Sequence, residues 1–234
     1  IKINNMFKSN IKILSFTLYY LTTVSAWNPS NYPFIPAGTD TSKVRQLIIE
    51  AQGINKKILD VGCGHGYSTS DCSGSLGIDN NIKSIKKAIK TFPNKNFKKE
   101  YLSNINKKYD VVTSMFHLHN IPRCKRKMLI KSARELAIER VVILDICPEY
   151  KKGKCALFKN KPFIKSYFET CREDLSDFTE TPLIEGLLHL WILNKNNTEE
   201  LEIPNVSSNS KVLHLANWRD NTIKWNTCEH LHMI

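Results

Sequence analysis

A short apolar run that breaks into alternating glycines constrains this chain more than any other feature. The run, Ile58 to Val61, is interrupted only by Asp60, and glycines follow at positions 62, 64 and 66. An apolar run of this length, with β-branched residues and a glycine stop, predicts a buried parallel strand. Glycines at alternate positions allow a tight turn after the strand and a close approach of the backbone to a ligand.

A second acid, Asp79, stands at the end of the next apolar run, Ser75 to Ile78. We expect its side chain at the tip of a strand that neighbours the glycine turn. A carboxylate in that place can accept hydrogen bonds from both hydroxyls of a ribose. The strand, the glycine turn and the strand-end acid together predict a pocket for a nucleoside-containing cofactor.

The glycine spacing favours one kind of cofactor. Residues 60–66, Asp-Val-Gly-Cys-Gly-His-Gly, differ from the G-x-G-x-x-G of dinucleotide binders. They resemble motif I of the class I S-adenosylmethionine-dependent methyltransferases, and a glycine turn in an unrelated α/β protein is the alternative. The resemblance implies that the loop packs against the methionine half of S-adenosyl-L-methionine. The cofactor-binding residues implied in this way are Asp60, Gly62, Cys63, Gly64, Gly66, Asp79, Asn80, Tyr101, Leu102 and Ser114.

Apolar spacing elsewhere predicts alternating strands and helices. Strands are expected over 109–116 and 140–146, from Phe97 onward, and as a hairpin within 183–193; helices are expected from Thr41 to Gly53 and over 81–92 and 123–137. Together with the resemblance, which covers roughly 41–194, this order predicts an α/β, Rossmann-like, doubly wound sheet. The sheet is expected to be mostly parallel and seven-stranded, with an antiparallel C-terminal hairpin.

Helical spacing also predicts which side chains are buried. The buried faces are expected to carry Ile82, Ile85, Ile89 and Phe92 in one helix and Met128, Leu129, Ala133 and Leu136 in another. The helix before the first strand either covers the cofactor cleft, as in the family, or only packs. Between Gly66 and Ser75 there is room for little more than one helical turn, as in a subgroup of small algal and bacterial methyltransferases.

The segment after the strand 109–116 resembles motif IV of the same family, where a strand ends between cofactor and acceptor. In the subgroup this segment contains His-Glu-x-Pro; His119 and Pro122 match, and Asn120 replaces the acid. His119 is therefore the candidate catalytic base, since an imidazole can take a proton from an attacking group. Methyl transfer also proceeds by in-line positioning alone, so a structural role for His119 remains open.

Two further boxes of that subgroup resemble residues 147–150 and 161–167, which the resemblance places on the substrate side. Lys161 stands where the subgroup has an acid, so the acceptor is left open. The first function considered is methyl transfer to a small-molecule acceptor. The alternatives are an RNA or protein methyltransferase, or a cofactor-binding module without activity.

Charge and cysteine content bear on the partners. The net charge is +12, from 34 basic and 22 acidic residues, and Lys83, Lys86, Lys87 and Lys90 share one predicted helix. These lysines are either a nucleic-acid footprint or a solvated face, and no aromatic residues are interleaved for base stacking. The seven cysteines show no paired spacing that predicts a disulfide framework or a zinc site. A small molecule is thus favoured over nucleic acid, and no metal is predicted.

The two ends of the chain are expected to lie outside the methyltransferase domain, 41–194. Residues 1–26 resemble a signal peptide, with Lys8 and Lys12 before an uncharged stretch that ends in Val-Ser-Ala. That stretch is shorter than the roughly 20 residues that span a bilayer. Trp27 follows, as in the bipartite presequences of algae with complex plastids, so 27–40 is a linker or transit segment and a plastid is the expected compartment. Secretion or the endoplasmic reticulum lumen is the alternative, and 195–234 is a polar tail.

Overall fold

The computed structural model describes residues 41–53, 55–150, 161–184 and 186–195. The predicted presequence, the linker and all but the first residue of the predicted tail lie outside these ranges. Among the described residues, no helix is both long and apolar enough to cross a membrane.

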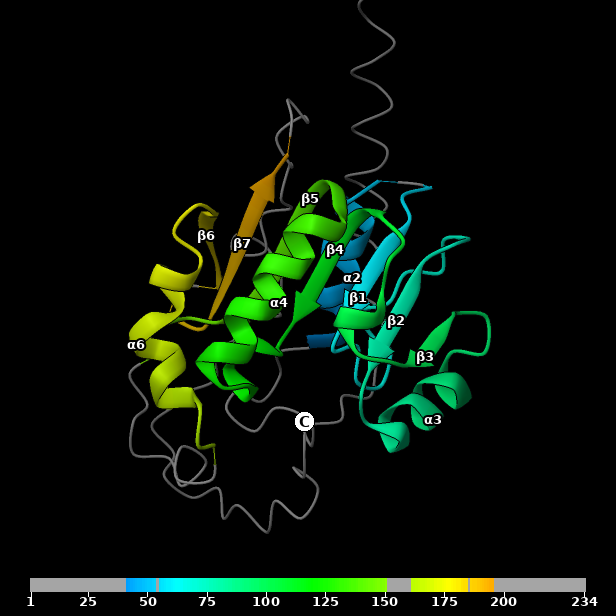
Figure 1. The fold of residues 1–234 in the computed structure, drawn as a ribbon, viewed down its shortest axis with the longest axis horizontal. Helices are drawn as coiled ribbons and strands as arrows, with labels where there is room; N and C mark the ends of the chain where they lie inside the picture. The colour runs from blue at the N-terminus through cyan, green and yellow to red at the C-terminus, as the bar shows by residue number, and fades with distance from the viewer. Residues whose placement is uncertain (1–40, 54, 151–160, 185, 196–234) are drawn as a thin grey trace, which may run out of the picture. The chain divides into compact units, whose positions relative to one another are not determined.

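Seven strands form one sheet, drawn in Figure 1. They are β1 (Ile58–Val61), β2 (Leu76–Asp79), β3 (Phe97–Lys99), β4 (Tyr109–Met115), β5 (Ala137–Ile146), β6 (Thr179–Ile184) and β7 (Leu188–Asn194). Their order across the sheet is β3-β2-β1-β4-β5-β7-β6. Neighbours from β3 to β5 pair in parallel, whereas β7 is antiparallel to both β5 and β6. The predicted fold, a mostly parallel seven-stranded sheet with an antiparallel hairpin, is confirmed.

The strand order creates a switch point between β1 and β4. From these two central strands the chain proceeds outward in opposite directions, through β2 and β3 on one side and through β5 on the other. Loops that leave the carboxyl ends of such a pair diverge, and ligands of open α/β sheets bind there. The glycine loop follows β1, and residues 116–120 follow β4, so both predicted halves of the site start at this point.

Within the described ranges, four α-helices and two short 3-10 turns accompany the sheet. They are α2 (Thr41–Ala51), α3 (Ile82–Thr91), η2 (Leu102–Asn104), η3 (Leu118–Asn120), α4 (Arg123–Leu136) and α6 (Ile164–Asp174). In Figure 1, α4 lies in front of the sheet and α2 behind it. The described residues between β1 and β2 form turns with no helix, which agrees with the short connection in the sequence.

Two predicted buried faces are partly wrong. Ile85 is buried as predicted, but Ile82 and Ile89 are 45% and 49% exposed, because α3 turns Ala88 inward beside Ile85. Met128 is 57% exposed, and in α4 the buried face includes Arg126, which is 0% exposed.

Arg126 is buried because a partner for its charge lies on another helix. Its Nε donates to Asp174 of α6 over 3.3 Å, and Nη2 donates to the hydroxyl of Thr170 over 2.7 Å.

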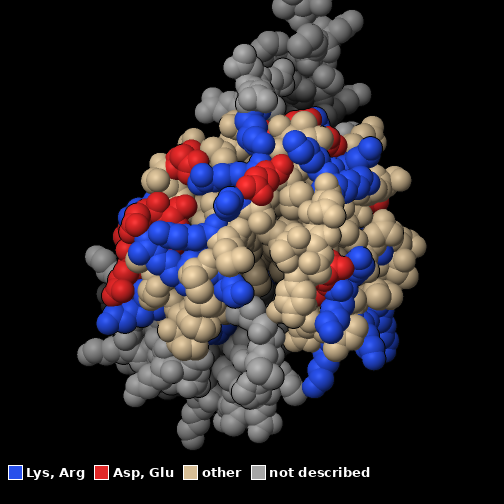
Figure 2. Space-filling model, in the orientation of Figure 1, with Lys and Arg blue, Asp and Glu red and all other residues tan. Residues whose placement is uncertain are grey.

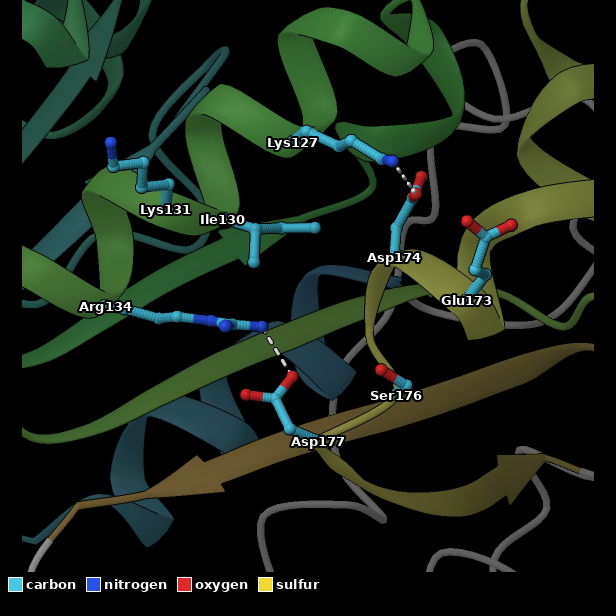
Figure 3. Close-up of a pocket in the computed structure, with 8 residues that line it drawn as sticks. All are labelled: Lys127, Ile130, Lys131, Arg134, Glu173, Asp174, Ser176 and Asp177. Atoms are coloured by element: carbon cyan, nitrogen blue, oxygen red, sulfur yellow. Dashed lines mark hydrogen bonds and ion pairs between the residues drawn. The ribbon is translucent and has the colours of Figure 1, made fainter.

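Farther along the same pair of helices lies a pocket whose lining is drawn in Figure 3. It is lined by Lys127, Ile130, Lys131, Arg134, Glu173, Asp174, Ser176 and Asp177, none of which is a predicted site residue. Ion pairs with Asp174 and Asp177 hold two of its cations, so the pocket is part of the α4–α6 packing.

Candidate functional site

Asp60 is the internal support of the glycine loop. Its side chain is 0% exposed, and Oδ2 accepts hydrogen bonds from Ser68 Oγ at 2.8 Å and Thr69 Oγ1 at 2.7 Å. Thr113 Oγ1 of β4 lies 3.4 Å from Oδ1. Desolvation raises the pKa of Asp60, and the bonds from Thr69 and Ser68 act against that rise. The carboxylate is therefore enclosed by protein hydroxyls, and its contribution to a cofactor site is to hold the loop.

Three glycines of the loop have positive φ, but they have different roles in the site. A Cβ on Gly62 would lie 2.5 Å from the His117 ring, and one on Gly66 would lie 2.6 Å from the Phe97 ring. These two glycines permit close packing of the loop against its own protein. Among the described residues, no atom lies within 4 Å of a Cβ built on Gly64, so within this part of the chain the backbone of Gly64 borders open space. Gly64 is the point where a ligand can approach the loop.

Asp79 faces that same point. Its Oδ2 accepts the backbone N–H of Gly64 at 2.9 Å, and its Oδ1 accepts the N–H of Asn81 at 2.8 Å. The side chain is only partly buried. Each carboxylate oxygen offers two lone pairs, so one on each oxygen remains for a further donor such as a ribose hydroxyl. The loop and the strand-tip acid, which are 15 residues apart, are thus brought together as the sequence predicts.

The remaining predicted cofactor residues divide into an outer and an inner group. Tyr101, at the end of β3, is 59% exposed, and Asn80 and Leu102 are partly exposed. The backbone N–H of Glu100 donates to the carbonyl of Asp79 over 3.1 Å, which places the start of this segment beside the ribose-site acid.

Cys63 and Ser114 form the inner group, at 1% and 2% exposure. Ser114 Oγ donates to the carbonyl of Val61 over 3.1 Å, so it joins β4 to the last residue before the loop. Burial raises the pKa of the Cys63 thiol, which keeps it neutral. Both side chains support the site from inside and present no group to the open space at Gly64.

The residue that follows β4 contacts α2, and α2 in turn contacts the segment that follows the glycine loop. Phe116 has φ +57°, a conformation that costs about 1–2 kcal/mol for a residue with a side chain. The Arg45 guanidinium of α2 lies 4.6 Å from the centre of the Phe116 ring, and its Nη1 lies 3.5 Å from Ser68 Oγ. Through Arg45 the helix α2 therefore contacts both sides of the switch point.

His119 belongs to a fully buried dyad. His119 Nδ1 lies 2.5 Å from Asp145 Oδ1, and both side chains are 0% exposed. The backbone N–H of His119 also donates to Asp145 Oδ2 over 3.3 Å. Asp145 thus fixes the ring of the predicted base, and it joins η3 to the end of β5. In this structure the imidazole does not face solvent, so any proton transfer by His119 requires an acceptor that reaches inside.

Asn120 and Lys161, the two positions that depart from the subgroup pattern, are in direct contact. Lys161 Nζ donates to Asn120 Oδ1. Asn120 Nδ2 in turn donates to the carbonyl of Phe116 over 3.0 Å. The two departures therefore form one interacting pair at the end of β4.

Sequence reasoning missed Asp145. Asp145 is an acid within an apolar strand run, as Asp60 is, and that shared feature is a signal that could have found it. No sequence signal marks His117, because its contact with Gly62 depends on how two loops meet.

Comparisons with known proteins add to this geometry. No protein-family model matches the chain. A putative methyltransferase, 235L, from Invertebrate iridescent virus 6 is 39% identical over 106 residues, which is 42% of this chain and 40% of the viral protein. The chain thus spans about two fifths of the length of that relative.

Solved structures are similar at the level of the fold. Magnesium protoporphyrin IX methyltransferase from Synechocystis PCC 6803 with bound SAH has a TM-score of 0.52 at 16% identity, over 77% of this chain and 93% of that one. The plantazolicin methyltransferase BpumL, in complex with a monoazolic desmethylPZN analog and SAH, has a TM-score of 0.51 at 16% identity, over 82% and 100% of the two chains. The described part of this chain has the fold of the S-adenosylmethionine-dependent methyltransferases.

Proposed function

We propose that this protein binds S-adenosyl-L-methionine at the β1–β4 switch point and transfers its methyl group to a small-molecule acceptor. The observation that carries the proposal is the contact between Gly64 and Asp79. It places a bare backbone, bordered by open space, next to a carboxylate with free lone pairs. That combination fits a ribose beside a loop that no side chain obstructs.

The chain's own residues would divide the work of binding. Asp79 would accept the ribose hydroxyls, and Gly64 would let the cofactor lie against the loop. Tyr101, exposed at the end of β3, is available to the adenine side. When bound, S-adenosylmethionine supplies an electrophilic methyl on a sulfonium. The protein's contribution to the rate is then to hold the acceptor in line with that methyl.

The acceptor side would be formed by residues 114–122. His119, held by Asp145, is the candidate base if the acceptor needs to lose a proton. The two similar methyltransferases act on a porphyrin and a plantazolicin-type molecule according to their descriptions. This supports a small organic acceptor.

Nucleic acid is the less favoured acceptor. On the face in Figure 2, Lys and Arg over α4 and α6 are interspersed with Asp and Glu. Arg123 and Arg134 of α4 and Arg172 of α6 each pair with carboxylates. The part of the basic surface formed by α4 and α6 is therefore offset by acids and offers a phosphate backbone little net attraction.

Calorimetric titration of the full chain tests the cofactor. We expect S-adenosylmethionine and S-adenosylhomocysteine to bind with 1:1 stoichiometry and NAD not to bind. NAD binding, or no binding of either sulfur nucleoside, would refute the assignment.

A cofactor-binding protein without transfer activity is the second candidate, favoured by the enclosure of His119 and by the Asn120–Lys161 pair. A panel of small-molecule acceptors with radiolabelled methyl donor separates the two. Cofactor binding with no transfer to any acceptor would support this second candidate.

A further inference from the structure

Three potential metal ligands meet where β5 ends. Ligand atoms of Cys147, Glu149 and His189 all lie within 4.8 Å of one another. Cys147 and Glu149 belong to a turn closed by a hydrogen bond from the Tyr150 N–H to the Cys147 carbonyl, 3.1 Å long. His189 lies on β7, directly across the sheet from Asp145. The group is assembled by the antiparallel β5–β7 pairing, which is why no sequence spacing reveals it.

We propose that Cys147, Glu149 and His189 bind a zinc-class divalent ion. One thiolate, one imidazole and one carboxylate are the ligand types that Zn²⁺ takes, and three protein ligands leave the fourth tetrahedral position to water. The Cys147 thiol already lies 3.1 Å from Glu149 Oε2. Ion binding would replace the thiol proton, which passes to water, with the metal.

Two of the proposed ligands, His189 and Glu149, are each oriented by a neighbouring side chain that is not itself a ligand, as metal ligands usually are. Glu180 Oε1 lies 2.5 Å from His189 Nδ1, and His189 Nε2 makes no hydrogen bond to a described residue. Arg172 bonds to Glu149 Oε1, which leaves Oε2 directed at the thiol. Arg172 also bonds to both oxygens of Glu180. The ligand nitrogen and oxygen are thus preorganised by groups that do not themselves coordinate.

The charges of the group also favour a dication. One guanidinium, Arg172, faces two carboxylates, Glu149 and Glu180, so the group carries a net negative charge while the thiol is protonated. A dication that displaces the thiol proton brings the group to neutrality. Cys147 is 1% and His189 6% exposed, so the thiolate and the imidazole would meet the ion away from water, whereas the Glu149 side chain is 46% exposed.

Cobalt is the probe of choice, because Co²⁺ bound to a thiolate gives a near-ultraviolet charge-transfer band. We expect the chelator-treated full chain to bind one Co²⁺ with this band and to release it to Zn²⁺. Cys147→Ser is expected to abolish the band. Glu149→Gln, a change at an exposed position, is expected to weaken Co²⁺ binding by at least about tenfold, and Glu180→Gln by about 10–100-fold.

Two controls separate this site from other thiols and imidazoles of the chain. Cys124→Ser alters an exposed cysteine of α4 that is outside the group, and it is expected to leave the band unchanged. A combined Cys228→Ser, His230→Gln, His232→Gln variant tests the histidine-containing C-terminal stretch. Absence of the band in the wild type, its persistence in Cys147→Ser, or its loss in the combined variant would overturn the proposal. Circular dichroism of every variant confirms that it is folded.

Discussion

The carboxylate of Asp79 accepts a hydrogen bond from the backbone N–H of Gly64, with 2.9 Å between Oδ2 and N. This bond joins the tip of β2 to the loop after β1. Glycine at 64 leaves the outer side of the loop open, whereas the neighbouring glycines at 62 and 66 are packed against rings. The proposed cofactor site rests on this one contact and on the space beside it.

Gly64→Ala is predicted to weaken cofactor binding more than it weakens the fold. The added methyl meets no atom of the described residues within 4 Å but stands in the space proposed for the cofactor, and φ +53° adds strain of about 1–2 kcal/mol. Gly186→Ala is the matched control, since Gly186 has φ +67° and an equally open Cβ position in the β6–β7 turn. Affinity for S-adenosylhomocysteine is expected to fall in the first variant only. Equal affinities in the two variants would contradict the placement.

Asp60→Ala is predicted to destabilise the protein by roughly 2–4 kcal/mol, since the buried hydroxyls of Ser68 and Thr69 lose their acceptor. Asp71→Ala, which changes an exposed acid of the same loop, is expected to stay within about 0.5 kcal/mol of wild type. Urea unfolding measures both. Similar unfolding midpoints for the two variants would show that Asp60 does not hold the loop.

Asp145→Ala is predicted to cost about 3–5 kcal/mol of stability, because it breaks a buried pair and leaves the His119 ring and N–H without that acceptor. The comparison with His119→Gln indicates which role matters. If His119 acts as a base, His119→Gln raises the activation free energy derived from kcat by more than it lowers the free energy of unfolding. A loss of stability with unchanged kcat would assign the dyad to structure alone.

Acid is predicted to destabilise the fold partly through His117. Desolvation lowers the pKa of His117, while Asp79 and Asp145 act against that shift. Below about pH 6.5 the unfolded chain binds a proton at this histidine, whereas the folded chain binds it only at a lower pH. The free energy of unfolding therefore decreases as the pH falls from about 6.5 toward the pKa that His117 has in the folded protein. The melting temperature of His117→Gln is expected to fall less between about pH 7.5 and 5 than that of wild type. Parallel curves would rule out this contribution.

The sequence predicted the strands well because the central ones are buried on both faces. Apolar runs such as 58–61 and 109–115 have only one reading in a parallel sheet. The edge strand β6 was predicted from Leu183, but it begins at Thr179, because an edge strand with an exposed face carries polar residues. Helix α6 was not predicted, and β5 begins at Ala137 rather than Arg140.

Side-chain roles were less predictable, because they depend on partners far along the chain. Arg126 is buried because it bonds to Asp174, 48 residues away, and to Thr170, 44 residues away. Asp60 belongs to the stretch that resembles motif I of the methyltransferases, yet that motif does not tell whether its carboxylate faces the ligand or the interior. Cys147 and His189 meet only through strand pairing. The spacing of residues in the sequence predicts where the site lies. The contacts among its buried side chains can be seen only in the folded structure.

The most direct test of the account is the affinity of Asp79→Asn for S-adenosylhomocysteine, measured by calorimetry. Asparagine can still accept the Gly64 N–H, but it lacks the charge that strengthens bonds from ribose hydroxyls, each about 1.5–3 kcal/mol. Asp110→Asn serves as control, since the Asp110 carboxylate accepts a backbone N–H from Lys57 at the start of β4. The account predicts a loss of about tenfold or more for Asp79→Asn and none for Asp110→Asn. Wild-type affinity in Asp79→Asn would contradict it.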